Sequence, residues 1–387
     1  MNKIVWLASW FPSKEEPLNG DFIKRHAEAV SLFKPVHVIH VKRRLKSYGK
    51  TIIENYQDDK FVNLTYSIAY YSMPNLFGIE KLASYCYALC LYHKMILQYK
   101  TKNGKIDLIH VHIALRAGWV ALLHHFFYRT PYFITEQYSG YMPEAKPFKP
   151  GFGFWRTNAL RIIFSRVSCF LPVSNALGHS FQQHFPIRHL QPIYNVVNMD
   201  IFKTDNNTPI KDGIPTFIHI STLTAQKNPE DMLRAFHTLK HEYLQAFLLQ
   251  IVGPCRSDLK QLAQDLAIDD CIAWIPETTQ QSLFKLIQHA DALVLYSRFE
   301  TFGCVNMEAI ASGIPVVVSD LPVFREYLLE GINAFFAETE NPKQLAATLH
   351  KCIETMPFNS KSIAATAHDF SYQHIGAKLI EIYKKYL

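Results

Sequence analysis

The stretch SRFETFGCVNMEAIASGIPVVVSD, residues 297–320, places two glutamates, Glu300 and Glu308, on either side of a glycine. The apolar run DALVLY precedes it and IPVVVS lies near its end, and each has the length and composition of a buried strand. A carboxylate beside buried strands is costly unless something pairs with it. The stretch therefore predicts a strand, a loop, a helix and a second strand, with two acids that need partners at the end of a sheet.

Outward from this stretch, apolar runs of strand length alternate with segments of helical spacing. In the first half the runs are KIVWLAS (3–9), PVHVIHV (35–41), IDLIHVHIA (106–114), TPYFITEQ (130–137), SRVSCFLPVS (165–174) and HLQPIYNVV (189–197). A second series begins with TFIHIST and continues to IPVVVSD. Such alternation produces parallel sheets covered by helices, so we expect an α/β chain with two doubly wound, Rossmann-like domains.

The domain boundaries follow from a polar segment in the middle of the chain. Residues 199–215 contain Pro, Gly and Asn and lack apolar periodicity, as interdomain linkers do. We expect an N-terminal domain at 1–197, a linker at 198–214 and a C-terminal domain at 215–370. The last helix, 371–387, could pack on either domain.

The turn at Gly303 predicts an anion site. Gly303 permits close backbone approach, and the amides of Gly303, Cys304 and Val305 belong to a helix N-terminus, which attracts phosphate. Glu300 precedes the turn and faces the expected cleft. Glu308 lies about one turn into the helix, where a carboxylate can bind both hydroxyls of a ribose. For a lone pair of glutamates a surface role is the better interpretation; the flanking strands and the F-G turn favour a nucleotide site.

The whole stretch resembles the donor-site motif of retaining family 4 glycosyltransferases, of the group 1 type. The shared pattern is two glutamates with seven residues between them, F-G after the first, and E-A followed by G-x-P-V after the second. The resemblance covers nearly the whole chain: residues 10–30 are similar to the N-terminal glycine loop, 193–202 to the interdomain segment, 221–236 to the phosphate loop and 370–383 to the closing helix.

The resemblance implies the GT-B fold, in which two doubly wound domains face a cleft and the closing helix commonly crosses back onto the N-terminal domain. Acceptors bind the N-terminal domain and the nucleotide sugar binds the C-terminal one. Carried over, the family's roles make Glu308 a ribose ligand, Lys227 a diphosphate ligand and Glu300 a donor-sugar ligand. The backbone of Thr301, Phe302 and Gly303 would also contact the sugar, and Gly20 would approach the phosphates.

The sequence also departs from the family pattern at two positions. The phosphate loop has Thr222 where the family carries arginine, so one cation is missing unless Arg298 or Arg325 replaces it. The strand-end T-x-H reads Thr135-Glu136-Gln137, and Gln137 can donate a hydrogen bond but cannot act as a base. The chain contains no D-x-D, so we expect no metal and no cofactor beyond the nucleotide sugar as co-substrate. The catalytic candidates are Glu300, Lys227 and Gln137.

Charge is divided unevenly along the chain. Through Asn195 there are 24 Lys and Arg against 11 Asp and Glu, a net +13, which leaves −6 for the remainder. Two segments, 41–50 and 146–166, each contain five cations, and the second also contains four phenylalanines and a tryptophan. Basic residues beside aromatics suit an anionic membrane surface and lipid-linked acceptors. Nucleic acid is disfavoured because no binding motif accompanies the charge.

The remaining composition indicates a cytoplasmic protein without a membrane span. No apolar run of spanning length occurs, the N-terminus lacks the features of a signal peptide, and the seven cysteines form no C-x-x-C pair. We expect a retaining, metal-independent glycosyltransferase, peripheral at the inner face of the cell membrane, that uses a UDP- or GDP-sugar in surface polysaccharide or glycolipid synthesis. Alternatives are a non-catalytic nucleotide-sugar or lipid-binding relative and a nucleotide-sugar epimerase of the same fold.

Overall fold

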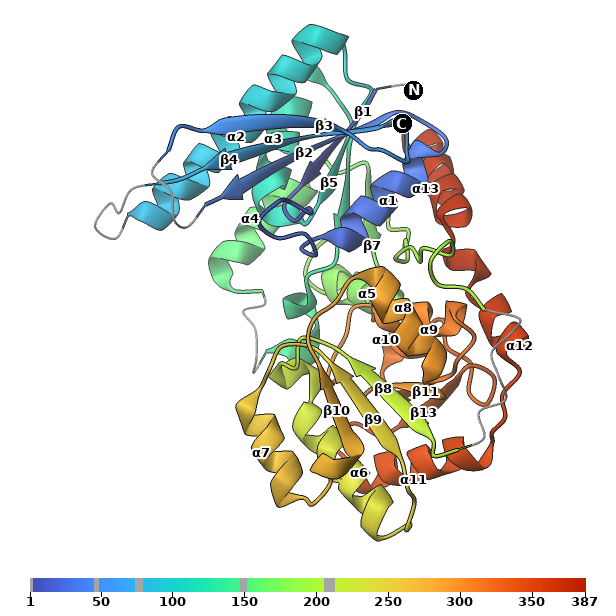
Figure 1. Cartoon of the computed structure of the whole chain (residues 1–387). Coiled ribbons are helices and arrows are strands. Elements are labelled where there is room, and N and C mark those ends of the chain that lie inside the picture. Colours follow the sequence, from blue (N-terminus) through green and yellow to red (C-terminus); the bar gives the residue numbers. More distant parts are fainter. Residues whose placement is uncertain (1–2, 45–48, 74–78, 147–151, 205–212) are drawn as a thin grey trace. The chain divides into compact units, whose positions relative to one another are not determined.

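The computed structural model describes residues 3–44, 49–73, 79–146, 152–204 and 213–387 (Figure 1). The chain forms two compact units. Unit 1 comprises Met1–Tyr141, Phe152–Val196 and Tyr372–Leu387, and unit 2 comprises Met142–Gly151 and Val197–Ser371. The closing helix thus belongs to unit 1.

Unit 1 is built on a seven-stranded sheet with the order β3-β4-β2-β1-β5-β6-β7. Every pairing is parallel except that of β3 with β4, which is antiparallel and forms one edge. The strands are β1 (Ile4–Ala8), β2 (Val36–Arg43), β3 (Ile52–Gln57), β4 (Leu64–Tyr71), β5 (Leu108–His112), β6 (Tyr132–Glu136) and β7 (Cys169–Pro172). The central strands β1 and β5 are buried throughout because helices cover both faces.

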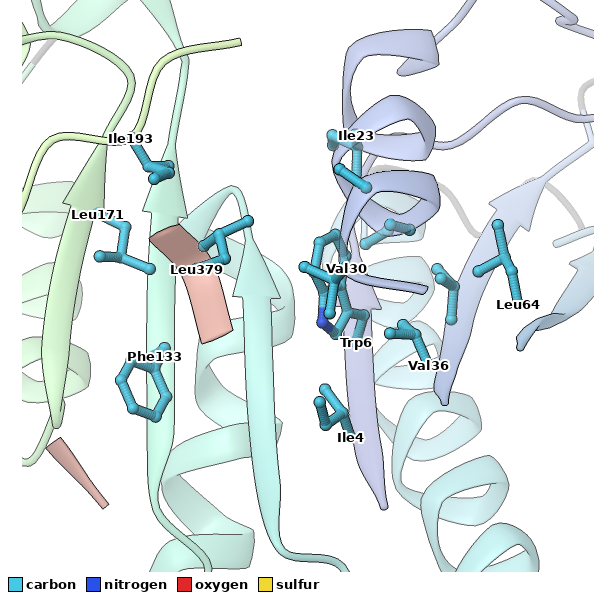
Figure 2. Packing of buried hydrophobic residues seen from close by; sticks show 14 of the residues in the cluster. Ile4, Trp6, Ile23, Val30, Val36, Leu64, Phe133, Leu171, Ile193 and Leu379 are labelled. Carbon is cyan, nitrogen blue, oxygen red and sulfur yellow. The ribbon is translucent and has the colours of Figure 1, made fainter. Parts of the chain in front are cut away.

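One face of this sheet is covered by α1 (Asp21–Ser31) and the closing helix α13 (Tyr372–Tyr386), which pack against each other. Figure 2 shows Val30 of α1 and Leu379 of α13 in the same apolar cluster as Trp6 of β1. The two helices approach closely at Gly376, where an added Cβ would lie 2.2 Å from the Ala29 carbonyl oxygen. The other helices of unit 1 are α2 (Glu80–Asn103), α3 (Ala114–Tyr128), α4 (Phe154–Phe164) and α5 (Asn175–Gln182).

The strand expected at 189–197 is not a strand in the structure. Its backbone runs beside β7, with hydrogen bonds from the Gln191 amide to the Phe170 carbonyl and from the Ile193 amide to the Pro172 carbonyl. Only an isolated bridge between Phe170 and Leu190 results. Pro172 of β7 has no N–H to donate to the Gln191 carbonyl, so the next bridge is not completed and a regular ladder does not form.

Unit 2 contains a six-stranded parallel sheet with the order β10-β9-β8-β11-β12-β13. Its strands are β8 (Thr216–Ile220), β9 (Leu248–Val252), β10 (Ile272–Ile275), β11 (Ala292–Leu295), β12 (Val316–Ser319) and β13 (Ala334–Ala337). Strand order reverses between β8 and β11, which are the neighbours that carry the phosphate loop and the Glu300 turn. Ligands of such sheets bind at this reversal, beyond the carboxyl ends of the strands.

The helices of unit 2 pack on the sheet through an apolar core that includes Phe217, Phe236, Ile251 and Val294. They are α6 (Pro229–His241), α7 (Ser257–Asp265), α8 (Gln280–His289), α9 (Cys304–Ala311), α10 (Pro322–Arg325), α11 (Pro342–Glu354) and α12 (Ser360–Ala365). All seven cysteines of the chain are free thiols. Within the described ranges, no helix combines the length and the apolar character needed to cross a membrane.

Candidate functional site

The turn that follows β11 is fixed by glycine geometry and by buried hydrogen bonds. Gly303 precedes α9 with φ of 81°, and a Cβ there would lie 2.9 Å from a ring carbon of Phe324. The Tyr327 hydroxyl donates to the Phe302 carbonyl, and the two rings stack with their centroids 4.8 Å apart. Only glycine adopts this backbone without strain. The turn is therefore held in one conformation at the N-terminus of α9.

The structure pairs Glu300 with Lys227, although the sequence alone indicated no partner for this carboxylate within the chain. The Lys227 ammonium donates to Glu300 Oε1, and the Ser297 hydroxyl donates to the same oxygen at 3.0 Å. The side chain of Glu300 is 6% exposed and that of Lys227 is 19% exposed. The ion pair offsets the cost of burying the carboxylate. It also brings together the two residues to which the resemblance assigns the sugar and the diphosphate.

The phosphate loop between β8 and α6 is joined directly to the Glu300 turn. The Gln226 side-chain amide donates to the Phe299 carbonyl at 3.0 Å, and the Arg298 amide donates to the Gln226 carbonyl at 2.8 Å. Left-handed backbone at Leu223 and Asn228 bends the loop. Lys227 is thereby held beside the turn, whereas Thr222 is exposed.

The two arginines considered as replacements for the missing cation are both occupied. Arg298 donates to the Ala225 carbonyl at 2.5 Å and pairs with Glu340 at 3.0 Å. Arg325 binds Asp320 through two bonds, of 2.7 and 3.0 Å. Arg298 therefore lies against the phosphate loop but supports its backbone, and Arg325 is committed to a surface carboxylate.

Glu308 is on the buried part of α9, with 3% of the residue exposed. The Ser312 hydroxyl donates to its carbonyl oxygen one turn further along. Cys304 and Val305 form the first turn of the helix and are half-buried. The sequence-predicted donor residues Thr301, Phe302 and Gly303 precede them, so the whole predicted set in this stretch lies on one strand-turn-helix unit.

In unit 1, Gly20 and Gln137 are the predicted site residues. Gly20 has φ of 76°, and an added Cβ would lie 2.5 Å from the Trp10 carbonyl carbon, so the loop after β1 can pass close to the start of α1. Gln137 is 8% exposed, and its side-chain nitrogen has no hydrogen-bond partner among the described residues. A buried amide without a partner is costly and is available to a ligand.

Sequence reasoning did not single out Glu136, the fully buried residue before Gln137. Its carboxylate accepts hydrogen bonds from the amides of Gln137, Tyr138 and Ala114, at 3.0, 2.9 and 3.0 Å. Burial raises the pKa of Glu136, and these amide donors oppose that shift. Glu136 thus ties the end of β6 to the start of α3 and positions Gln137. A charged residue inside an otherwise apolar strand was the signal that could have identified it.

His112 ends β5 and is 1% exposed. Neither ring nitrogen has a hydrogen-bond partner in the described part of the chain, and the ring lies 4.2 Å from that of Trp6. Burial and the neighbouring His110 hold the pKa of His112 well below its ordinary value. The imidazole is therefore neutral at physiological pH.

The structure revises the first of the two basic segments. In 41–50, Lys42 pairs with Glu16, Arg43 with Glu80, and Arg44 with Glu15 at 2.9 Å. These cations are neutralised locally and do not form an open basic patch; residues 45–48 lie outside the described residues. In the second segment, residues 147–151 lie outside the described part, and residues 154–164 form α4.

A separate cavity of 770 Å³ lies in unit 1, where β2, β3 and β4 meet the C-terminal half of α2. His37 is among its lining residues and is within hydrogen-bond distance of the Thr65 and Ser67 hydroxyls, at 2.8 and 3.2 Å. None of the sequence-predicted site residues lines this cavity. The strand-turn-helix unit of Glu300 is therefore the better candidate site, because it combines a helix N-terminus with a buried cation.

Known proteins resemble the chain in sequence and in structure. Residues 200–368 match the family model Glycosyl transferases group 1. Curated relatives include an uncharacterized glycosyltransferase of Methanocaldococcus jannaschii (25% identical; 45% of this chain, 46% of the relative) and the alpha-monoglucosyldiacylglycerol synthase of Streptococcus pneumoniae (28%; 45% and 40%). Another is the O-antigen chain mannosyltransferase RfbU of Salmonella typhimurium (29%; 51% and 54%). The chain spans about half the length of the curated relatives that it matches.

Solved structures resemble the chain over its full length. The sucrose-phosphate synthase of Thermosynechococcus elongatus has a TM-score of 0.77 at 14% identity, covering 99% of both chains. The Anabaena protein HepE, in complex with UDP, has a TM-score of 0.71 at 16% identity, covering 99% of this chain and 100% of the other. These likenesses establish the fold. Residues 200–368 thus form a group 1 glycosyl transferase domain, on a chain that has the GT-B fold.

Proposed function

We propose that this chain is a retaining, metal-independent glycosyltransferase that moves a sugar from a UDP- or GDP-sugar to a glycan or lipid-linked acceptor. The observation that carries the proposal is the buried pair of Lys227 and Glu300 beside the Gly303 turn. A cation, a carboxylate and a helix N-terminus meet there at the reversal point of a parallel sheet, the usual place of a nucleotide ligand.

In the proposed reaction, the bond between the sugar carbon and the diphosphate oxygen breaks, and its electron pair leaves with the nucleoside diphosphate. An acceptor hydroxyl attacks the same face of the sugar carbon, and a phosphate oxygen takes its proton. Lys227 leaves Glu300 for the diphosphate and stabilises the developing charge, together with the N-terminus of α9. Glu300 is then released to bind sugar hydroxyls, and Glu308 binds the ribose.

The donor class is supported by the relatives. HepE is similar in fold and was solved with UDP, which makes UDP-sugars the first donors to test. The pneumococcal relative is named for a glycolipid product and the Salmonella one for O-antigen, which supports an acceptor in glycolipid or surface polysaccharide synthesis. With such acceptors, the basic first half of the chain suits a peripheral position at the cytoplasmic face of the cell membrane.

The test is a transfer assay that detects both the released nucleoside diphosphate and the glycosylated product. The purified chain is incubated with UDP- or GDP-sugars, with a chelator present, and with membrane extract as the source of acceptor. We expect turnover in wild type, its loss in Glu300→Ala, and wild-type rates in the exposed control Glu277→Ala. Full turnover in Glu300→Ala would contradict the role of that residue. Nucleotide-sugar binding without any turnover would favour a non-catalytic relative, and interconversion of donor sugars would favour an epimerase.

A further inference from the structure

We propose that the cavity of unit 1 beside His37 is a binding cleft for a neutral sugar unit of a glycan, separate from the predicted acceptor-side residues of that unit. The cavity has a volume of 770 Å³ and lies where strands β2, β3 and β4 face the last turns of α2. This size is typical of small-molecule sites. The proposal rests on the proposed function in taking the glycan to be part of the acceptor, but it is tested without a sugar donor.

The cavity lies at the opposite end of the sheet from the predicted site residues of unit 1. His37 and Thr65 are near the amino ends of the parallel strands β2 and β4. Gln137 follows the carboxyl end of β6, and Gly20 lies in the loop that follows β1. A sugar unit bound beside His37 is therefore not the one that reacts, and the cleft holds a more distant part of the same glycan.

Polar side chains of three neighbouring strands form the floor of the cavity. Thr65 of β4 is paired with His37 of β2 on one side and with Gln57 of β3 on the other. Ser67 of β4 is paired with Asn55 of β3. Paired residues and alternate residues of a strand share one face of a sheet, so these five side chains lie on the same side. A sheet face beneath a helix is ordinarily apolar, and this group of polar side chains points to a polar ligand.

Hydrogen bonds fix the floor of the cavity and leave donors for a ligand. The Ser67 hydroxyl, which lies beside the His37 ring, donates to the Asn55 side-chain oxygen at 2.6 Å. The two N–H groups of the same amide therefore stay available. Gln98 of α2 also lines the cavity, is exposed, and makes no hydrogen bond within the described part of the chain. The two amides are thus placed to bind hydroxyl groups.

The cavity has little charge, which favours a neutral ligand. Among the described residues that line it, Lys102 is the one charged side chain, and none is a carboxylate. Burial, together with nearby Lys102, lowers the pKa of His37 to about 4, so the imidazole is uncharged at neutral pH. The last turns of α2 have the partial negative charge of a helix C-terminus, which opposes an anion. A phosphate or a metal ion is therefore disfavoured.

A sugar ring matches both the polar and the apolar parts of the lining. Its hydroxyls donate and accept hydrogen bonds, as amide and hydroxyl side chains do. Buried Met95 and the half-buried Ile53 and Tyr99 provide apolar contact for the carbon-bound hydrogens of the ring. The Tyr99 ring is held in place because it stacks on that of His37, with the centroids 4.7 Å apart.

The test is saturation-transfer NMR on the full chain with no donor present. The probes are the methyl glycosides of glucose, galactose, mannose and N-acetylglucosamine, with inorganic phosphate as a competitor. Asn55→Ala/Gln98→Ala removes the two exposed amides of the cleft, and Lys102→Met removes its cation. The matched control is Gln182→Ala/Gln183→Ala, two exposed amides of unit 1 outside the cleft. Circular dichroism confirms that each variant is folded.

We expect saturable binding of at least one glycoside, about tenfold or more weaker in Asn55→Ala/Gln98→Ala and unchanged in the control and in Lys102→Met. That glycoside should also slow hydrogen–deuterium exchange in the peptides that cover 53–57 and 95–103. The proposal is overturned if no glycoside binds saturably, if the loss of both amides leaves binding unchanged, or if exchange slows in other peptides alone. Displacement of the glycoside by phosphate in a manner that depends on Lys102 would also overturn it.

The same variants separate this proposal from the transfer reaction. Donor hydrolysis should proceed at the wild-type rate in Asn55→Ala/Gln98→Ala, because the cleft is separate from the predicted site residues. Glycoside binding in the cleft without any transfer by wild type would contradict the proposed function and support this proposal. Transfer by wild type without glycoside binding in the cleft would do the reverse.

Discussion

The Lys227–Glu300 pair gives the most specific prediction about the donor site in the absence of ligand. Lys227→Met removes the cation that the buried Glu300 carboxylate binds, whereas Glu300→Gln removes the carboxylate and keeps its shape. The double variant removes both charges. These four proteins form a double-mutant cycle, which isolates the energy of the pair.

The burial of each partner determines how much stability each variant is expected to lose. Removing one member of a buried pair costs about 3–5 kcal/mol. The Lys227 side chain keeps 19% of its exposure, so we expect a cost below that range, about 2–3 kcal/mol, for Lys227→Met. In Glu300→Gln the ammonium can turn toward water, and the cost should be about 1 kcal/mol. The double variant should cost about the same as Glu300→Gln, which gives a coupling energy of about 2–3 kcal/mol.

Two buried cysteines allow the two units to be followed separately. Cys352 of α11 and Cys169 of β7 are both fully buried, in unit 2 and unit 1 respectively. Pulsed thiol labelling in urea, read by mass spectrometry, reports the unfolding of each unit through its own thiol. Labelling of Cys352 should shift to lower urea in Lys227→Met, and labelling of Cys169 should stay unchanged.

The surface pair of Lys240 and Asp270 in unit 2 supplies the control. Asp270 is 69% exposed, so Lys240→Met should cost less than about 1 kcal/mol. Single-variant costs at Lys227 and Glu300 that add within about 0.5 kcal/mol would refute the reasoning, since they would show that the two charges do not depend on each other.

Three further predictions concern other parts of the chain. Gly303→Ala should destabilise unit 2 by about 1–2 kcal/mol and abolish transfer. Gly331→Ala, also at positive φ but in open space, should leave transfer intact. Cys352 labelling measures the change in stability, and the transfer assay measures the change in activity. Gln137→Ala should lower transfer to the acceptor but not hydrolysis of the donor, and an equal loss of both rates would contradict an acceptor-side role. Burial lowers the pKa of five histidines from 6.5 to about 4 and holds the pKa of His110 and His112 well below 6.5. Protonation therefore favours the unfolded chain, and stability falls as the pH drops from 6.5 toward 4. Pulse proteolysis at pH 7 and pH 5 should therefore show a larger loss of stability in unit 1 than in unit 2, and equal losses would count against this. The affected histidines are His219 in unit 2 and, in unit 1, His26, His37, His40, His110, His112 and His124.

The alternation of strands and helices could be predicted where apolar runs were clear, as at 3–9 and 292–319. The edge strand β3 of the first sheet could not be predicted, because its residues are half-buried or exposed and include Glu54 and Gln57. It therefore lacks an apolar run. The expected strand at 189–197 was wrong because Pro172 of β7 cannot donate a hydrogen bond to the Gln191 carbonyl, so the pairing stops after one bridge. Periodicity reports burial, and it does not report whether each amide can join a ladder.

For the candidate site, the local unit was predictable and the long-range partner was not. Glu300, Gly303 and Glu308 lie within one short stretch, and their types and spacing identified the turn. The pairing of Glu300 with Lys227 joins positions 73 residues apart, and no local pattern in the sequence indicates it. The same limit applies to the basic segment 41–50, where Lys42, Arg43 and Arg44 are neutralised by acids from distant positions such as Glu80.

The central claim is that a nucleoside diphosphate binds at the Glu300 turn of unit 2. Hydrogen–deuterium exchange of the full chain, with and without UDP or GDP, tests it most directly. The account predicts slower exchange in the peptides that cover 221–228 and 299–308, and the loss of that protection in Lys227→Met. Protection confined to unit 1, for example around the cavity beside His37, would contradict it.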